Sequence, residues 1–370
     1  MSAPSSAKKA LRVGLFSSFP RSDANGIARY QWQIMDFLER GDIIFDLVRI
    51  RKNNQTKFFR FVEMALRFLE SPFYYRKSSV DLVWGPSHKL PFMLPRNIPC
   101  VLTIHDLAWK KVPETMPPYR RFTESLLMPI ALKRADLVIT VSQSTADDLL
   151  SYFPECLGKV RVIHLGGIDR NVDAIGSETL PAAALDKPYV LFVGTIEPRK
   201  NLLRLLEAFS ELPYEVRSNF NLIVAGDEGW GDLKVSSKVE SLGLTGSVIL
   251  AGKVSEDALS RLYKYAYCLA MPSLYEGFGL PIIEAHCFSV PVITSNCSSM
   301  PEVAGDGALY IDPLNVENIC AALKNILSDA NLRDELSRKA LVNSMRFSWE
   351  RSASQTHEVF RAAFERRQPI

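Results

Sequence analysis

The chain has 370 residues, enough for two domains of ordinary size, and its composition of 47% hydrophobic and 23% charged residues is that of a globular protein. A net charge of +3 is too small to indicate a nucleic-acid partner, and it would not repel an anionic ligand or an anionic membrane surface. The six cysteines are scattered without a C-x-x-C pair, which favours reduced thiols in a cytosolic protein over disulfides or a zinc site.

Short apolar strands alternate with helical patterns along the whole chain. The first half has predicted strands at 11–16, 43–50, 81–84, 100–104, 136–141 and 160–164. The second half has them at 189–194, 220–225, 247–250, 267–270, 291–294 and 308–311. Continuous Val, Ile and Leu strands separated by helices indicate buried parallel sheets. The predicted fold is α/β, with two Rossmann-like, doubly wound domains facing across a cleft.

A stretch without a predicted strand or helix separates the two series of strands. Residues 168–187 contain Asp, Gly, Ser, Pro and several alanines without clear periodicity, as is typical of a linker. We therefore predict a first domain at 1–170, a linker at 171–187 and a second domain at 188–346. In such folds, ligands bind beyond the carboxyl ends of the strands.

The segment Glu276-Gly-Phe-Gly-Leu-Pro-Ile-Ile-Glu284 follows the predicted strand 267–270. Its two glycines permit tight turning, Pro281 suits the first turn of a helix, and the amides of a helix start attract phosphate. The spacing places the first acid on the loop and the second on the helix. The bland alternative is a glycine turn with two solvated glutamates.

A second polar loop, Gly194-Thr-Ile-Glu-Pro-Arg-Lys-Asn-Leu202, follows the first strand of the second domain. Arg199 and Lys200 stand at a strand's carboxyl end, where two cations suit a diphosphate and the charge it develops on leaving. Asn201 is a candidate helix cap. Taken alone, the loop is equally compatible with a solvated basic pair.

These two motifs together resemble retaining glycosyltransferases of the GT-B fold, the large family 4, and in particular the bacterial mannosyl- and rhamnosyltransferases of surface-polysaccharide assembly. The likeness extends over nearly the whole chain. Further matching segments are 25–30, 103–109, 136–144, 160–169 and 299–305. In this fold the final segment, 347–370, typically forms a helix that returns to the first domain.

The resemblance implies specific roles for the matching residues. Arg199 and Lys200 would bind the diphosphate, Glu276 would orient the sugar, and His105 would hydrogen-bond a sugar hydroxyl; a buried structural histidine is the alternative for His105. Glu284 would hold the ribose. The full set of implied donor-binding residues is Gly26, Lys253, Val254, Gly277, Phe278, Gly279, Leu280 and Glu284.

The sequence also departs from the family pattern. Thr195 occupies the place where many relatives have an arginine, so Arg199 must supply that charge from another position. No Asp-x-Asp motif occurs, which agrees with a reaction that needs no metal, and we expect no cofactor. The resemblance implies transfer with retention, by front-face attack with the departing phosphate as base.

The acceptor side is less specific. The resemblance implies a GDP-sugar as the preferred donor and a glycan or polyprenyl-linked oligosaccharide as the acceptor, in O-antigen-type lipopolysaccharide assembly. Residues 57–70 read as a helix with one charged stripe, which suits either a membrane interface or a core helix with one wet face. The segment 119–122 reads as a solvated, basic helix start. We expect a cytoplasmic enzyme, at the inner face of the membrane if that helix binds lipid.

Two other functions fit the same sequence. A sugar-nucleotide epimerase of the same fold would bind a similar donor and would turn it over without an acceptor. A non-catalytic sugar-binding protein or membrane scaffold belongs to a different class. The intact set of Glu276, Glu284, Arg199, Lys200 and His105 argues against that second alternative.

Overall fold

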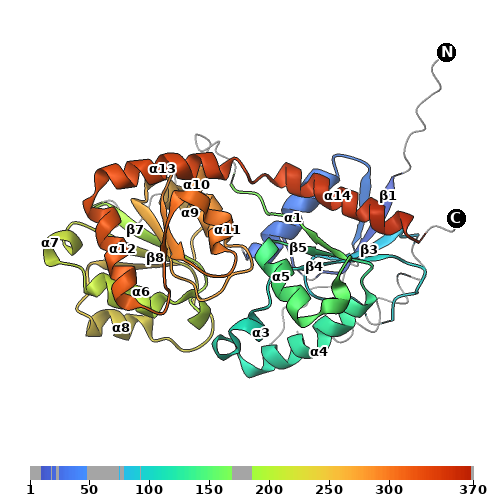
Figure 1. The fold of residues 1–370 in the computed structure, drawn as a ribbon, viewed down its shortest axis with the longest axis horizontal. Helices are drawn as coiled ribbons and strands as arrows, with labels where there is room; N and C mark the ends of the chain where they lie inside the picture. Colours follow the sequence, from blue (N-terminus) through green and yellow to red (C-terminus); the bar gives the residue numbers. More distant parts are fainter. Residues whose placement is uncertain are drawn as a thin grey trace, which may run out of the picture. The chain divides into compact units, whose positions relative to one another are not determined.

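We describe a computed structural model of the chain, over residues 10–17, 19–21, 25–47, 75, 79–91, 93–168 and 186–367. The predicted helix at 57–70 and nearly all of the predicted linker lie outside these residues. The chain divides into two compact units (Figure 1). The first contains Met1–Leu107, Phe122–Leu165 and Trp349–Ile370, and the second contains Ala108–Arg121 and Gly166–Ser348.

The first unit is built on a six-stranded parallel sheet with the order β2-β1-β3-β4-β5-β6. Its strands are β1 (Leu11–Leu15), β2 (Ile43–Leu47), β3 (Leu82–Gly85), β4 (Cys100–Ile104), β5 (Leu137–Thr140) and β6 (Val160–Val162). Every residue of the inner strands β3, β4 and β5 is buried, whereas the edge strand β6 is partly exposed. This is why the inner strands read as continuous apolar runs in the sequence.

The second unit repeats this plan with the order β12-β11-β10-β7-β8-β9. Its strands are β7 (Tyr189–Val193), β8 (Asn221–Ala225), β9 (Val248–Gly252), β10 (Cys268–Met271), β11 (Val292–Ser295) and β12 (Ala308–Ile311). All pairings are parallel. The two parallel sheets with their helices confirm the predicted α/β fold class.

Helices connect the strands, as parallel pairing requires. The helices of the first unit are α1 (Gly26–Leu38), α5 (Gln143–Tyr152), α14 (Trp349–Glu365) and most of α4 (Pro118–Arg134). Those of the second are α3 (Ala108–Lys111), α6 (Leu202–Ser210), α7 (Tyr214–Arg217), α8 (Val235–Ser241), α9 (Glu256–Tyr265), α10 (Leu280–Cys287), α11 (Met300–Ala304), α12 (Val316–Ser328) and α13 (Ala330–Ser344). Short 3-10 turns are η1 (Pro113–Thr115), η2 (Pro154–Cys156), η5 (Pro198–Lys200) and η6 (Gly305–Gly307).

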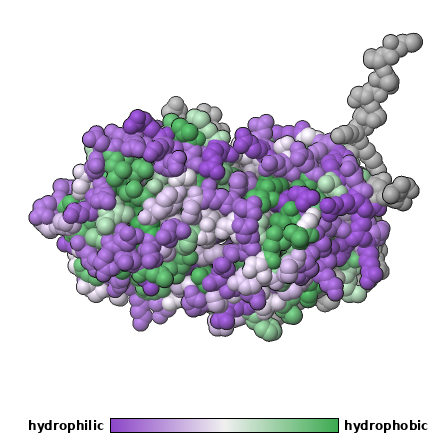
Figure 2. Space-filling view, viewed as in Figure 1, coloured by the Kyte–Doolittle hydropathy of each residue, from purple (hydrophilic) through white to green (hydrophobic). Residues whose placement is uncertain are grey.

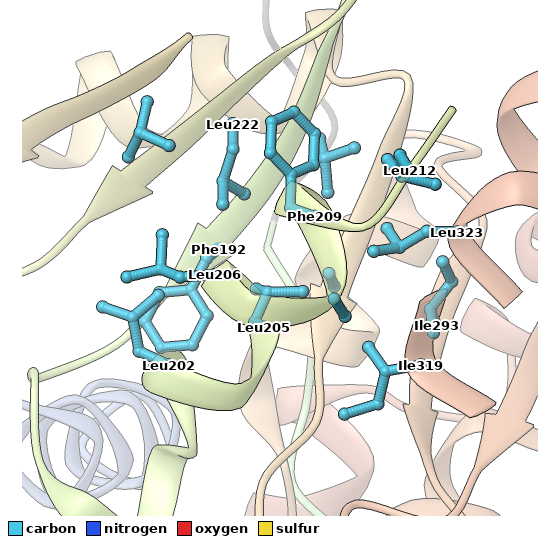
Figure 3. Packing of buried hydrophobic residues seen from close by; sticks show 14 of the residues in the cluster. Phe192, Leu202, Leu205, Leu206, Phe209, Leu212, Leu222, Ile293, Ile319 and Leu323 are labelled. Atoms are coloured by element: carbon cyan, nitrogen blue, oxygen red, sulfur yellow. The ribbon is translucent and has the colours of Figure 1, made fainter. Parts of the chain in front are cut away.

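The core of the second unit forms where α6 packs between its sheet and α12. Figure 3 shows Leu202, Leu206 and Phe209 of α6 against Phe192 and Leu222 of the strands. These side chains are almost completely buried, and each contributes roughly 1.5–3 kcal/mol of transfer free energy. This packing fixes α6, and with it the loop that precedes α6.

In the core of the first unit, the hydroxyl groups of Thr103 and Tyr30 lie among aromatic rings. Trp84 packs edge-on against Tyr30 and Phe360, with ring centroids 5.9 and 5.4 Å apart. The hydroxyl of Thr103 lies 3.1 Å from Tyr30 Oη and accepts from Trp84 Nε1 at 3.1 Å. These bonds satisfy groups that would be costly to bury alone. Phe360 belongs to α14, so the C-terminal helix forms part of this core.

All six cysteines are free thiols: Cys100, Cys156, Cys268 and Cys287 are buried, and Cys297 and Cys320 are partly buried. Burial raises the pKa of five of these thiols, those of Cys100, Cys156, Cys268, Cys297 and Cys320. No helix among the described residues combines the length and apolarity needed to cross a membrane.

Candidate functional site

The polar residues of the second unit gather where the order of its strands reverses. The chain runs from β7 outward through β8 and β9, then returns to β10 beside β7 and continues outward through β11 and β12. The loops that follow β7 and β10 therefore leave the same edge of the sheet side by side. This reversal is the position where open α/β sheets bind their ligands.

A buried carboxylate between two cations occupies this position. Arg199 Nη1 donates to Glu276 Oε2 at 2.8 Å, and Lys200 Nζ donates to Glu276 Oε1 at 2.6 Å. Glu276 is only 6% exposed. Burial by itself would raise its pKa, but the two cations outweigh that effect and lower the pKa to about 2. Glu276 is therefore ionised at neutral pH.

Glu197 is a fourth member of this cluster that sequence reasoning did not select. It is 2% exposed, and its Oε1 accepts a hydrogen bond from Arg199 Nη2 at 2.7 Å. Burial raises the pKa of Glu197, and the neighbouring Arg199 and Lys200 offset only part of this rise. The guanidinium of Arg199 thus lies between two carboxylates, with a third bond to the carbonyl of Tyr275 at 2.7 Å. A Glu-Pro pair at a strand end is the sequence signal for Glu197.

Backbone conformation holds the two cations in place. Gly194 has φ of 146°, and a Cβ there would come within 3.4 Å of the Lys200 side chain. Asn201 stands before α6 in the left-handed conformation, and its side chain makes no capping bond to that helix. It donates instead to the carbonyls of Pro272 and Pro313, at 2.9 and 2.7 Å. Asn201 is thus the N-cap residue of α6, as predicted, but its side chain fastens the β7 loop to two other loops and does not bond to the helix.

Two serines form hydrogen bonds to the backbone of the loop that carries Glu276. Ser298 Oγ accepts from the backbone N–H of Glu276 at 3.0 Å, and Ser299 Oγ donates to the carbonyls of Glu276 and Phe278 at 3.0 Å each. Phe278 packs edge-on against Phe347, with ring centroids 5.7 Å apart. These contacts hold the backbone of the loop in one conformation.

The same loop leads directly into α10. Gly279 adopts φ of 98° at the N-cap, a conformation that L side chains rarely adopt, and Pro281 lies in the first turn. The loop thus contains Gly277, Phe278 and Gly279, and Leu280 is the first residue of the helix. The helix N-terminus favours a negatively charged ligand.

Glu284 lies in the middle of α10. It is 3% exposed, and its Oε2 accepts a hydrogen bond from Tyr263 Oη at 2.7 Å. Lys253 and Val254 follow the edge strand β9, which is separated from β10 by the two strands β7 and β8. The structure thus brings together Arg199, Lys200 and Glu276, and places Lys253, Val254 and the Gly277–Leu280 loop after strands of the same sheet.

The first unit contains the remaining predicted site residues. His105 follows β4 and is partly buried, and its Nε2 lies 2.8 Å from the carbonyl oxygen of Pro86. Because a carbonyl only accepts, Nε2 carries the hydrogen and Nδ1 is left as an acceptor. Burial lowers the pKa of His105 to about 4, so the ring is neutral at pH 7. Gly26 is exposed at the first turn of α1, whose N-cap is Asn25.

The described residues contain no group of three or more His, Cys, Asp or Glu side chains arranged to hold a metal ion. The clearest ligand-binding feature is the pair of cations beside a helix N-terminus. Such an arrangement suits a phosphate group, which carries charge and accepts several hydrogen bonds.

Comparisons with known proteins agree with this chemistry. Two family models match the chain: Glycosyltransferase Family 4 at residues 26–169 and Glycosyl transferases group 1 at residues 181–341. The O-antigen chain mannosyltransferase B of Escherichia coli is 35% identical over 282 residues, which cover 75% of this chain and 73% of that protein. The chain is a family 4 glycosyltransferase. The family resemblance seen in the sequence is confirmed.

Solved structures show that this glycosyltransferase has the GT-B fold. Sucrose-phosphate synthase from Thermosynechococcus elongatus superposes with a TM-score of 0.76 and 20% identity, over 96% of this chain and 99% of that one. Anabaena HepE, solved with UDP-glucose, superposes with a TM-score of 0.72 and 18% identity, over 95% of this chain and 99% of that one. At such identities the likeness establishes the fold alone.

Proposed function

We propose that this glycosyltransferase moves mannose or rhamnose from a GDP-sugar onto a glycan or lipid-linked oligosaccharide, with retention of configuration, in the assembly of an O-antigen-type surface polysaccharide. The observation that carries the proposal is the buried cluster of Glu276, Arg199 and Lys200 at the strand reversal, beside the N-terminus of α10. The mannosyl group is favoured because the E. coli relative is an O-antigen chain mannosyltransferase.

The charge of the cluster suits a leaving diphosphate. Lys200 donates to Glu276, and an ammonium group has three N–H donors, so it retains capacity for a phosphate oxygen. Arg199 is held between Glu197 and Glu276 and presents its charge without having to reorganise. Groups fixed in this way stabilise developing charge more effectively than mobile ones.

The chemical step follows from this charge. The bond between the anomeric carbon and the diphosphate oxygen breaks, and a new bond forms from the acceptor oxygen to the same face of the anomeric carbon. The acceptor proton passes to the departing phosphate. Lys200, Arg199 and the amides of Gly279 and Leu280 stabilise the negative charge that develops on the diphosphate.

The remaining residues position the donor. Glu276 accepts from hydroxyls of the transferred sugar, as the family resemblance implies, and Glu284 accepts from the ribose hydroxyls. Lys253 and Val254 contact the base. In the first unit, the Nδ1 of His105 accepts from a sugar hydroxyl, and Gly26 permits close approach of its backbone to the donor. The HepE structure contains UDP-glucose, so a UDP-sugar is the alternative donor to be tested against the GDP-sugar.

The test is transfer itself. Purified protein is incubated with GDP-mannose, GDP-rhamnose, UDP-glucose or dTDP-rhamnose and a polyprenyl diphosphate-linked oligosaccharide, and the product is analysed by mass and by anomeric NMR. We expect an added hexose in the α configuration with a GDP-sugar. An inverted product, or conversion of the donor to an epimer without acceptor, would contradict the proposal.

A further inference from the structure

The buried cluster of the second unit contains as many carboxylates as cations. Glu276 accepts from Arg199 Nη1 at 2.8 Å and from Lys200 Nζ at 2.6 Å, and Glu197 accepts from Arg199 Nη2 at 2.7 Å. Glu197 is 2% exposed and Glu276 is 6% exposed. With both carboxylates ionised, the four side chains together carry no net charge, so the cluster compensates its own charges.

A nucleotide sugar would bring negative charge into this balanced cluster, since each of its two phosphate groups is ionised at neutral pH. Hydrophilic residues cover most of the face drawn in Figure 2, and charges on such a surface are screened by water and salt. The cluster is buried, so uncompensated charge is costly there, and a buried acid in that position becomes neutral instead. We therefore expect one of the two carboxylates to gain a proton when a diphosphate binds.

The hydrogen bonds of the two carboxylates indicate which of them gains it. Both oxygens of Glu276 accept from a cation, Oε1 from Lys200 and Oε2 from Arg199, so a proton on Glu276 has to displace one of these bonds. Glu197 accepts from Arg199 through Oε1 alone, and its Oε2 has no hydrogen-bond partner in the described part of the chain. Oε2 of Glu197 can therefore hold a proton while the bond from Arg199 stays intact.

The charged side chains that influence Glu197 come from two segments. They are Arg199 and Lys200 of η5 and Glu276 of the loop before α10. Burial already raises the pKa of Glu197, and the two cations offset only part of this rise. A diphosphate beside the cations adds negative charge near Glu197, and a nearby like charge raises the pKa of a carboxyl group further.

We propose that Glu197 takes up one proton from solvent when the diphosphate of the donor binds to Arg199 and Lys200. The proposal rests on the proposed function, which gives the diphosphate to these two cations. No covalent bond between heavy atoms changes in this step: the proton adds to Oε2 of Glu197 and returns to solvent when the diphosphate product leaves. The neutral carboxyl group removes one negative charge from the occupied site, so Glu197 makes donor affinity depend on pH.

Proton uptake fixes the sign of that dependence. Because the complex holds one proton more than the free protein and donor, affinity falls as pH rises, by up to about tenfold for each pH unit. This range lies between the pKa of Glu197 in the free protein and its higher pKa in the complex. Glu197→Gln is uncharged at every pH and keeps an acceptor oxygen for Arg199. It should bind the donor without this dependence, and about tenfold more tightly than the unaltered chain at about pH 8.

The experiment is isothermal titration calorimetry of the full chain with GDP-mannose and with UDP-glucose, in buffers of equal pH and different ionisation enthalpy. The slope of the observed enthalpy against the ionisation enthalpy of the buffer counts the protons taken up. Over about pH 5 to about pH 8 we expect a maximum of about one proton for the unaltered chain and close to none for Glu197→Gln. Nucleotide sugars are used because the terminal phosphate of a free nucleoside diphosphate itself titrates near pH 6.

The matched control is Glu207→Gln. Glu207 is also paired with a cation, Lys238, but both side chains are partly exposed, so this variant should take up the proton as the unaltered chain does. Binding without proton uptake, or with the same uptake by Glu197→Gln, would overturn this proposal and leave the proposed function standing. Weaker binding by Glu197→Gln at every pH would also overturn it, since Glu197 would then only position Arg199. Absence of binding by both nucleotide sugars would overturn the two proposals together.

Discussion

The two units bury polar groups near the carboxyl ends of their strands in different electrical states. In the second unit Glu276 is a buried anion compensated by Arg199 and Lys200. In the first unit His105 is a neutral ring that donates to a carbonyl, and the Tyr30 hydroxyl, whose pKa is raised by burial, is also neutral. The charged cluster can exchange a carboxylate for a phosphate, whereas the neutral group can only offer or accept hydrogen bonds. This difference is the reason we propose that the diphosphate binds to the second unit.

The largest expected effect is loss of transfer on removal of the buried anion. In Glu276→Ala the two cations lose their partner and the sugar loses an acceptor, so kcat/KM should fall by about a thousandfold. Glu276→Gln keeps the shape and separates loss of charge from loss of packing. The matched control is Glu335→Ala, an exposed acid on α13 that pairs with Lys339. Unchanged transfer by both Glu276 variants would show that the buried charge of the second unit has no role in the reaction.

The next effect concerns Lys200, the cation that we propose faces the phosphate. Lys200→Ala should lower kcat/KM by about a hundredfold, because one charge that stabilises the leaving group is lost. Lys238→Ala is the control, since Lys238 also forms an ion pair with a glutamate, Glu207, but on the surface between α8 and α6. Steady-state rates at several donor concentrations measure both variants. Equal rates for the two would assign Lys200 a structural role only.

The substitution Thr103→Val tests the neutral, hydrogen-bonded group of Thr103, Tyr30 and Trp84 in the first unit. This change leaves Tyr30 Oη and Trp84 Nε1 without the hydroxyl that they share, and it should lower the free energy of unfolding by about 2 kcal/mol. Thr140→Val is the control, because Thr140 Oγ1 is buried and finds no hydrogen-bond partner in the described part of the chain. Denaturant unfolding of both variants should show a cost for Thr103 and none for Thr140. A similar cost at both positions would refute this account.

The smallest expected effect is a difference in pH dependence. The folded pKa of Glu276 is about 2, below its ordinary 4.5, so its stabilising contribution is present above pH 4.5 and is lost as pH falls toward 2. The folded pKa of His105 is about 4, below its ordinary 6.5, so protonation favours the unfolded chain as pH falls from 6.5 to 4. Buried His286 titrates in the same range.

Melting temperatures between pH 7 and pH 2 measure both effects. His105→Asn should flatten the decline between pH 6.5 and 4, and Glu276→Gln should flatten the decline below pH 4.5. His286→Asn measures the contribution of the buried histidine of the second unit over the same pH range as His105. If His105→Asn changed only the lower range, the neutral state assigned to its ring would be wrong.

Much of the fold was predictable because its inner strands are buried on both faces. All twelve predicted strands occur in the structure. Fully buried strands such as 100–104 and 221–225 are easy to recognise because they appear in the sequence as continuous, largely apolar runs. The order of the strands was not predictable from these runs. That order brings Arg199 next to Glu276, which lies 77 positions later in the sequence.

The parts of the site that escaped prediction depend on tertiary contacts. Asn201 has the sequence position of a helix cap, but its partners are carbonyls 71 and 112 residues away. Glu197 resembles an ordinary polar loop residue until the fold buries it against Arg199. Ser298 and Ser299 support the Glu276 loop through backbone bonds that no motif specifies.

The most direct test of the donor site is the melting temperature of the unaltered chain and of Lys200→Ala with GDP-mannose, UDP-glucose and dTDP-rhamnose. A ligand that binds only the folded state raises the melting temperature, by an amount that grows with its affinity. We predict the largest rise with the GDP-sugar for the unaltered chain and little or none for Lys200→Ala. Equal rises for the two proteins, or no rise with any nucleotide sugar, would contradict the assignment of the Glu276 cluster to the donor diphosphate.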